Sequence, residues 1–113
     1  MRWILLCGLA LSVVASTSGV RAADAAHGKE MYMKVGCYEC HGTQGQGAIT
    51  GPKLAPEPLP YDGFAAFVRS TSQQMPPYTA KLLSDNDLAD IHAYLASIPK
   101  PPDPKSIPIL SQR

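Results

Sequence analysis

Two cysteines and a histidine stand close together at residues 37–41, which read CYECH. Cys37 and Cys40 are separated by two residues, so their thiols can each form a thioether with a vinyl group of one haem. His41 follows directly and would then lie beneath the ring as a ligand of the iron. The pattern predicts one covalent haem c, which would serve electron transfer, gas binding or peroxide chemistry.

Two other chemistries use a pair of cysteines at this spacing. A dithiol redox motif belongs near a βαβ pattern, and no alternating strand pattern precedes Cys37. A structural zinc site needs four ligands. From residue 24 onward the chain adds only His27 and His92, which do not form the spaced pair of a zinc module. Haem is therefore favoured, and zinc stays as an alternative.

The second axial ligand decides which haem chemistry follows. Histidine and methionine together keep the iron six-coordinate and raise its reduction potential, whereas an empty position admits oxygen, nitric oxide or peroxide. Met75 is the favoured ligand, because it lies in a predicted loop and the two prolines after it restrict the backbone. Met31 and Met33 belong to a helix on the histidine side, and His92 is the rival ligand.

Helices are predicted to position these residues. The first spans residues 24–35 with Asp24 as its cap, and a short helix follows the loops with Asp62 as its cap. The last helix starts with a capping box at Ser84 and stops at Pro99. Its core-facing stripe consists of Leu88, Ile91, Leu95 and Ile98. One face of the short helix carries Phe64, Phe67 and Val68.

Glycine and proline mark the irregular segments. Residues 42–60 hold four glycines followed by four prolines, which predicts a loop that wraps round a rigid object. Residues 70–78 are expected to be irregular as well. Residues 100–113 carry four prolines and should form an extended tail. The tail is expected to pack on the domain surface, with docking to a partner as the alternative.

The first 22 residues have the form of a cleaved secretory signal peptide. Arg2 precedes a mostly apolar run over residues 4–14, and small residues stand before a cleavage site after Ala22 or Ala23. The apolar run ends at residue 16, short of the roughly 20 residues that a spanning helix needs. We therefore expect a periplasmic protein without a transmembrane segment in its mature form. The expected organisation is leader 1–22, domain 23–99 and tail 100–113.

The mature chain would be small and nearly neutral. About 90 residues make one domain, and a domain of this size often needs a metal or a similar staple, which haem would provide. Without Arg2 and Arg21, eight Lys and Arg face nine Asp and Glu. No basic run is present, so the sequence gives no support for nucleic-acid binding.

Four motifs in order give the chain a resemblance to small class I cytochromes c, over about residues 24–98. Gly28 and Tyr32 match the first helix of that family, and GPKL at residues 51–54 matches its loop after the haem motif. MPPY at residues 75–78 matches its methionine loop, and residues 83–95 match its final helix. The resemblance implies an all-α cytochrome c fold, with three to four short helices round one haem and the terminal helices crossing.

The resemblance also implies roles for individual residues. Cys37 and Cys40 would carry the thioethers, and His41 and Met75 would ligate the iron. The carbonyl group of Pro52 would accept a hydrogen bond from His41 Nδ1. Two positions near the core also follow from it: Gly28 would allow the first and last helices to cross, with Tyr32, Tyr94 and Leu95 packed there. Some members place a tryptophan near a haem propionate; the mature chain has none, and Tyr61 or Arg69 are candidates to replace it.

The expected function is one-electron transfer without a catalytic residue. The chain would act as a free shuttle or as the cytochrome subunit of a periplasmic dehydrogenase. Its partners would be a dehydrogenase, an oxidase or a membrane electron-transfer complex, and it would be a monomer or one subunit of a hetero-complex. The alternative is a five-coordinate haem protein that binds a gas or peroxide.

Overall fold

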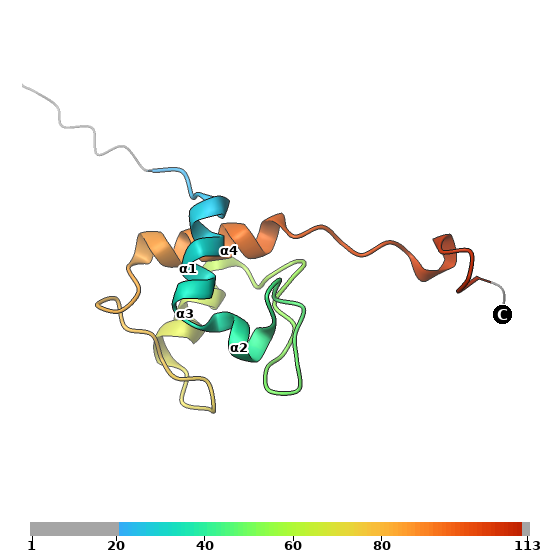
Figure 1. Ribbon diagram of the computed structural model, residues 1–113. Helices are drawn as coiled ribbons and strands as arrows, with labels where there is room; N and C mark the ends of the chain where they lie inside the picture. Colours follow the sequence, from blue (N-terminus) through green and yellow to red (C-terminus); the bar gives the residue numbers. More distant parts are fainter. Residues whose placement is uncertain (1–20, 112–113) are drawn as a thin grey trace, which may run out of the picture.

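The computed structural model describes residues 21–111 and contains, in that range, helices but no strand. The helices are α1 (Ala25–Lys34), α2 (Cys37–His41), α3 (Tyr61–Ser70) and α4 (Asp85–Ser97), followed by the 3₁₀ helix η1 (Pro104–Ser106). Helices α1 and α4 cross, while α2 and α3 lie on the same side of α4 (Figure 1). The segment after α4 stretches away from the other helices. The predicted all-α fold with crossing terminal helices is confirmed.

Side-chain caps determine where α1 and α4 begin. The Asp24 carboxylate accepts hydrogen bonds from the backbone N–H groups of Ala26 and His27, at 2.9 and 3.1 Å. Ser84 Oγ accepts a hydrogen bond from the backbone N–H of Asp87 at 3.1 Å. These N–H groups have no partner inside the helix, so a cap supplies one. Both predicted helix starts are confirmed.

Three local predictions differ from the structure. Helix α3 begins after Pro60, so Asp62 lies in its first turn and is not its cap. A carboxylate there still interacts favourably with the helix N-terminus. The cysteines and histidine of the haem motif form the short helix α2, which the sequence did not predict. The tail is extended apart from η1, where the Asp103 side chain accepts a hydrogen bond from Lys105 N–H at 2.8 Å.

Helices α1 and α4 cross with their backbones in contact at Gly28. A Cβ atom added to Gly28 would lie 1.8 Å from the carbonyl oxygen of Asp90 and 2.9 Å from the nitrogen of Ile91. Any side chain at residue 28 would therefore force the two helices apart. This confirms the predicted crossing at Gly28.

A buried carboxylate ties the same two helices together. The Asp90 side chain is fully buried on α4, and the Asp24 backbone N–H donates to it at 2.7 Å. His27 Nδ1 lies 2.8 Å from Asp90 Oδ2, and the Arg21 guanidinium donates at 3.0 and 3.3 Å. Each polar atom of this buried group is therefore matched by a donor from the start of the described chain.

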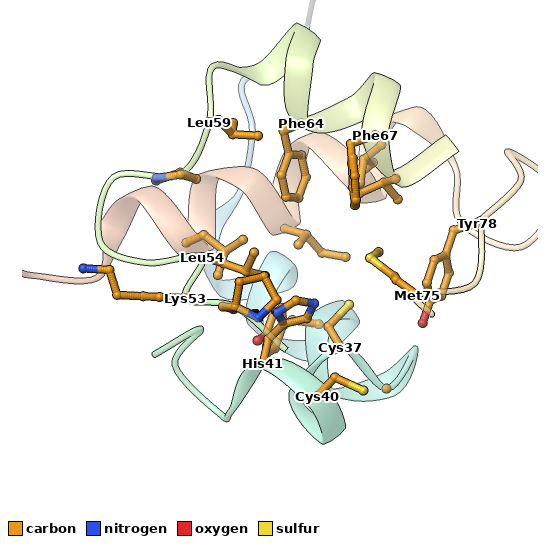
Figure 2. Close-up of a pocket in the computed structure, with 18 of the residues that line it drawn as sticks. Cys37, Cys40, His41, Lys53, Leu54, Leu59, Phe64, Phe67, Met75 and Tyr78 are labelled. Carbon is orange, nitrogen blue, oxygen red and sulfur yellow. Dashed lines mark hydrogen bonds between the residues drawn. The ribbon is translucent and has the colours of Figure 1, made fainter. Parts of the chain in front are cut away.

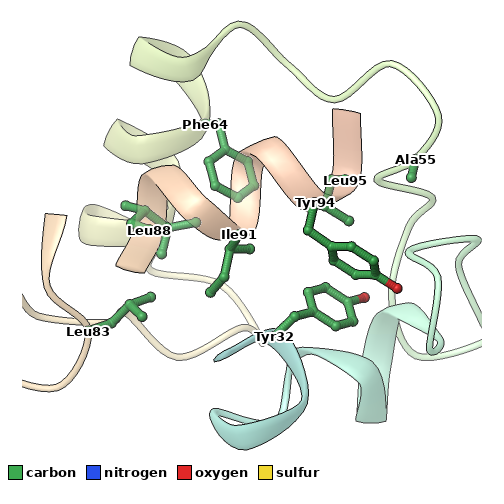
Figure 3. Close-up of a cluster of buried hydrophobic side chains, with 9 residues drawn as sticks. Tyr32, Ala55, Phe64, Leu83, Leu88, Ile91, Tyr94 and Leu95 are labelled. Atoms are coloured by element: carbon green, nitrogen blue, oxygen red, sulfur yellow. The ribbon is translucent and has the colours of Figure 1, made fainter. Parts of the chain in front are cut away.

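The core lies along one side of α4 (Figure 3). Tyr32 of α1 and Tyr94 of α4 meet edge to face with ring centroids 5.5 Å apart. Their hydroxyl groups donate to the carbonyl oxygens of Gly42 and Thr43, at 2.7 and 2.8 Å, and so fix the chain directly after α2. The buried apolar residues are Tyr32, Ala55, Phe64, Val68, Leu83, Leu88, Ile91, Tyr94 and Leu95. Ile98 is only partly buried, at the end of the predicted stripe.

The expected leader lies outside the described residues, apart from Arg21 and Ala22. Among residues 21–111, no helix combines the length and the apolar character that crossing a bilayer requires.

Candidate functional site

Helix α2 holds the two cysteines and the histidine of the haem motif at one wall of a cavity. Gly36 precedes the helix with a φ of +83°, which a residue with a side chain rarely adopts, and this turn separates α1 from α2. His41 is buried, Cys37 is half-buried and Cys40 is exposed. Burial raises the pKa of the Cys37 thiol to about 11, so this sulfur is protonated at neutral pH until it is modified.

The Pro52 carbonyl group fixes the orientation of the His41 ring. His41 Nδ1 lies 2.8 Å from the Pro52 oxygen. Because a carbonyl oxygen only accepts hydrogen bonds, Nδ1 carries the proton and Nε2 keeps its lone pair for a metal. Gly51 makes the approach possible, since a Cβ atom there would lie 2.6 Å from the Cys40 carbonyl oxygen and 3.0 Å from His41 Nδ1.

The cavity has a volume of about 710 Å³ and is mostly apolar. Cys37, Cys40 and His41 line it from one side (Figure 2). Met75 lines it from the methionine loop, which we define as residues 71–84 between α3 and α4. Figure 2 shows the Met75 sulfur directed into the cavity, across from the His41 ring. Leu54, Leu59, Phe64, Phe67, Val68, Tyr78, Leu83, Leu88, Ile91 and Leu95 supply the apolar surface.

The other sulfur and imidazole groups named as possible ligands do not line this cavity. Met31 and Met33 are partly buried and pack against the hydrophobic core from α1. His92 Nε2 lies 2.8 Å from the carbonyl oxygen of Leu59, and its ring contacts Phe64. His92 thus holds the loop before α3 in place.

Tyr61 and Arg69 bond with α4 and the methionine loop. The Tyr61 hydroxyl donates to the Asp85 carbonyl oxygen at 3.3 Å. The Arg69 guanidinium donates to the Tyr78 carbonyl oxygen at 2.8 Å and to Asp85 Oδ1 at 2.7 Å. Neither side chain lines the cavity, so their polar groups are committed to joining α3 with the segment that follows it.

Sequence reasoning missed two residues at the site. The Tyr78 ring lines the cavity, and its hydroxyl donates to the Val35 carbonyl oxygen at 2.9 Å. Among the described residues that line the cavity, Lys53 is the only Lys or Arg. Each of them lies inside a quoted motif, MPPY and GPKL, and the signal that could have drawn attention to them is that both are polar among apolar neighbours.

The donor set and the shape of the cavity fit a haem c group. Two cysteine sulfurs at C-x-x-C spacing stand beside an imidazole whose Nε2 is free, and a thioether sulfur lies across the cavity. The remaining lining is large and apolar, as a flat hydrophobic ring requires. A zinc site would need four ligands at about 2.0–2.3 Å from one ion. Among the described residues, the His, Cys, Asp and Glu side chains that lie close enough to share an ion are His27, Asp87 and Asp90, and this group includes no residue of the haem motif.

The comparisons with known proteins agree with this chemistry. The family model for cytochrome C oxidase, cbb3-type, subunit III matches residues 23–95. Neither the search of curated proteins nor the search of solved structures found a match. The matched segment contains the haem motif, the crossing helices and the methionine loop. The chain therefore belongs to this cytochrome family and is a small class I c-type cytochrome with a covalently bound haem c.

Proposed function

We propose that this cytochrome is a periplasmic one-electron carrier whose haem iron has His41 and Met75 as axial ligands. Cys37 and Cys40 carry the thioethers. The observation behind the proposal is that the His41 ring and the Met75 sulfur face one another across an apolar cavity. Haem in such a site supplies an iron that alternates between the ferrous and ferric states.

The surrounding residues favour electron transfer over substrate chemistry. The Pro52 carbonyl group keeps the proton on His41 Nδ1 and makes the imidazole a stronger donor through Nε2. Leu54, Phe64 and Phe67 line the cavity and would help to exclude water from a haem bound there. Among the described residues that line the cavity, no second histidine and no arginine stands on the Met75 side, where peroxide chemistry would need a polar group.

We further propose that the protein is exported and that residues 1–22 are removed. The leader-like sequence supports this, as does the need of c-type cytochromes for reduced thiols that meet haem outside the cytoplasm. Donor and acceptor are redox proteins, and the chain works as a free shuttle or as the cytochrome subunit of an oxidoreductase. The intact mass of protein from the periplasmic fraction should equal a chain that starts at Ala23 or Asp24 plus one haem.

The ferric spectrum of the holoprotein tests the ligand pair. Wild type should show the weak far-red charge-transfer band of methionine bound to iron. Met75→Ala should lose this band and bind carbon monoxide readily in the ferrous form, because the open position is then free. Met33→Ala is the matched control, since it removes a thioether that packs in α1 and leaves the cavity unchanged.

The opposite result would support the gas-binding alternative. If wild type lacks the band and binds carbon monoxide as readily as Met75→Ala, the iron is five-coordinate and the electron-carrier proposal is wrong. A protein that carries zinc and no haem absorption would overturn both.

A further inference from the structure

Three hydrogen bonds converge on Tyr78, three residues after Met75. The Tyr78 backbone N–H donates to the Val68 carbonyl oxygen of α3 at 2.9 Å. The Tyr78 carbonyl oxygen accepts from Arg69 Nη1 at 2.8 Å, and its hydroxyl donates to the Val35 carbonyl oxygen at 2.9 Å. The backbone N–H, the carbonyl oxygen and the side-chain hydroxyl of Tyr78 are therefore each fixed to another residue.

The Tyr78 side chain spans the edge of the cavity. Its backbone belongs to the methionine loop, while its hydroxyl reaches Val35, at the end of α1 and two residues before Cys37. Figure 2 shows the ring beside Met75, at the boundary between the loop and the helix that carries the cysteines. This contact links the two walls that carry the proposed ligands.

Arg69 holds the same loop from the other side. The guanidinium is mostly buried, with 22% of its side chain exposed, and it bonds with Tyr78 and with Asp85 at the start of α4. A planar guanidinium can satisfy two acceptors at once in a fixed geometry, which a lysine ammonium does less well. The end of α3, the methionine loop and the start of α4 are thus joined through one side chain.

The residues between Tyr78 and Met75 transmit this constraint. Pro76 and Pro77 have a fixed φ, and a residue that precedes proline is restricted in ψ. Few free torsions remain between Tyr78 and the Met75 backbone. A thioether is a weak ligand of iron, so its occupancy depends on how well the protein holds the sulfur in place.

We propose that Arg69 and Tyr78 are positioning residues that keep the Met75 sulfur directed at the haem iron. The proposal rests on the proposed function, because it requires Met75 to be the ligand. Without the Tyr78 hydroxyl or the Arg69 guanidinium, the loop would sample positions in which the sulfur leaves the iron. An external ligand could then take the open position.

Imidazole binding to the ferric holoprotein measures this opening. Imidazole binds only when the methionine is off, so its apparent affinity rises with the fraction of open protein. Tyr78→Phe and Arg69→Ala should each raise that affinity by about tenfold, the effect of losing one hydrogen bond to a charged or buried group. Both should weaken the methionine band and lower the reduction potential. Arg69→Lys should lie between Arg69→Ala and wild type.

Tyr94→Phe is the matched control. It also removes one tyrosine hydroxyl that donates to a backbone carbonyl group, at 2.8 Å from Thr43, but this bond lies on the histidine side. It should lower stability without changing imidazole affinity or the methionine band. Asp85→Asn removes the ion pair and leaves the bond from Arg69 to Tyr78, so it should change imidazole affinity much less than Arg69→Ala.

Two results would count against the inference in different ways. If Tyr78→Phe and Arg69→Ala fold with wild-type imidazole affinity, band and potential, the positioning role is wrong while Met75 remains the ligand. If wild type already binds imidazole as tightly as Met75→Ala, the ligand assignment itself fails.

Discussion

The absence of a side chain at Gly28 sets the distance between α1 and α4. A Cβ atom there would overlap the Asp90 backbone at 1.8 Å, and backbone atoms cannot move aside as a flexible side chain can. The two helices also carry Tyr32 and Tyr94, whose hydroxyls fix the chain after α2. The lack of a Cβ atom at Gly28 therefore helps to determine where the haem motif lies.

Gly28→Ala should destabilise the holoprotein by about 3 kcal/mol or more, because overpacking against a rigid backbone has few ways to relax. Thermal unfolding should show a midpoint lower by roughly 10–20 °C for a domain of this size. Gly63→Ala is the control, since a Cβ atom at this exposed position of α3 meets nothing within 4 Å. It should stabilise the protein by about 0.5–1 kcal/mol. Equal effects at the two positions would contradict the crossing geometry.

At the scale of elements, Asp90 determines how the pairing of α1 with α4 responds to pH. Burial alone would raise the pKa of its carboxyl group, but hydrogen bonds from the Asp24 N–H, from Arg21 and from His27 outweigh it and lower the pKa below the ordinary value of 3.8. Arg21 belongs to the proposed leader, so the Asp24 N–H and His27 are the partners that remain in the mature protein. The neighbouring carboxylates are Asp24 and Asp87. A lowered pKa means that the unfolded chain binds the proton more readily, so acid favours unfolding.

The stability that Asp90 contributes should therefore be complete above about pH 4 and be lost as the pH falls further. Asp90→Asn should lower the melting temperature of the holoprotein by about 5–10 °C at pH 7, because a charged acceptor is replaced by a neutral one. The difference in melting temperature between Asp90→Asn and wild type should shrink at pH 3. Asp62→Asn, in the exposed first turn of α3, is the control. Its difference in melting temperature from wild type should not shrink between pH 7 and pH 3. A constant difference from pH 7 to pH 3 would contradict the role of the charge.

Elements with a local signal were predictable from the sequence, and those made by distant contacts were not. Asp24 and Ser84 are caps whose effect is confined to the next turn, so α1 and α4 could be located. Helix α2 has only five residues between two glycines, and no period can be read in so short a segment. The bond from Tyr78 to Val35 joins residues 43 positions apart, which no local pattern encodes.

In the candidate site, too, residues with a local sequence signal were predictable and those positioned by distant contacts were not. The haem motif has a fixed spacing that follows from the chemistry of haem, so Cys37, Cys40 and His41 could be named directly. Met75 could be named because it lies in a predicted loop and is followed by two prolines that restrict the backbone. The position of Arg69 could not, because a sequence does not show which of several acceptors a long side chain will reach.

On the scale of the whole molecule, the segments that face the cavity carry almost no charge. Residues 40–52 and 70–80 contain no Asp, Glu, Lys or Arg. Lys53 and Glu57, one of each sign, line the cavity from the loop between these two segments. Most other charged residues lie on the helices and in the tail, where both signs are mixed. The side chains of these two segments should therefore add little long-range guidance for a partner, and the two haem propionates should supply most of the charge near the haem.

Electron transfer with small redox reagents of opposite charge tests this expectation. Because added salt screens the negative haem propionates, ferricyanide should react somewhat faster and hexaammineruthenium somewhat slower as the Debye length falls from about 30 Å to 3 Å, each rate constant changing less than about tenfold. A strongly charged access face would accelerate one reagent and slow the other at low salt. Stopped-flow measurements over that range of Debye length test the expectation. A change above about tenfold in the rate constant for either reagent would overturn it.

The cavity of about 710 Å³ lies where a domain of this size would otherwise have the centre of its core. Without haem, the apolar side chains that line this cavity would face water, and the free energy gained by burying them would be lost. We therefore expect the chain to reach its stable fold only when haem is attached. A copy without haem should then be open to proteases, so the amount of intact protein in a cell should follow how much haem was delivered to it.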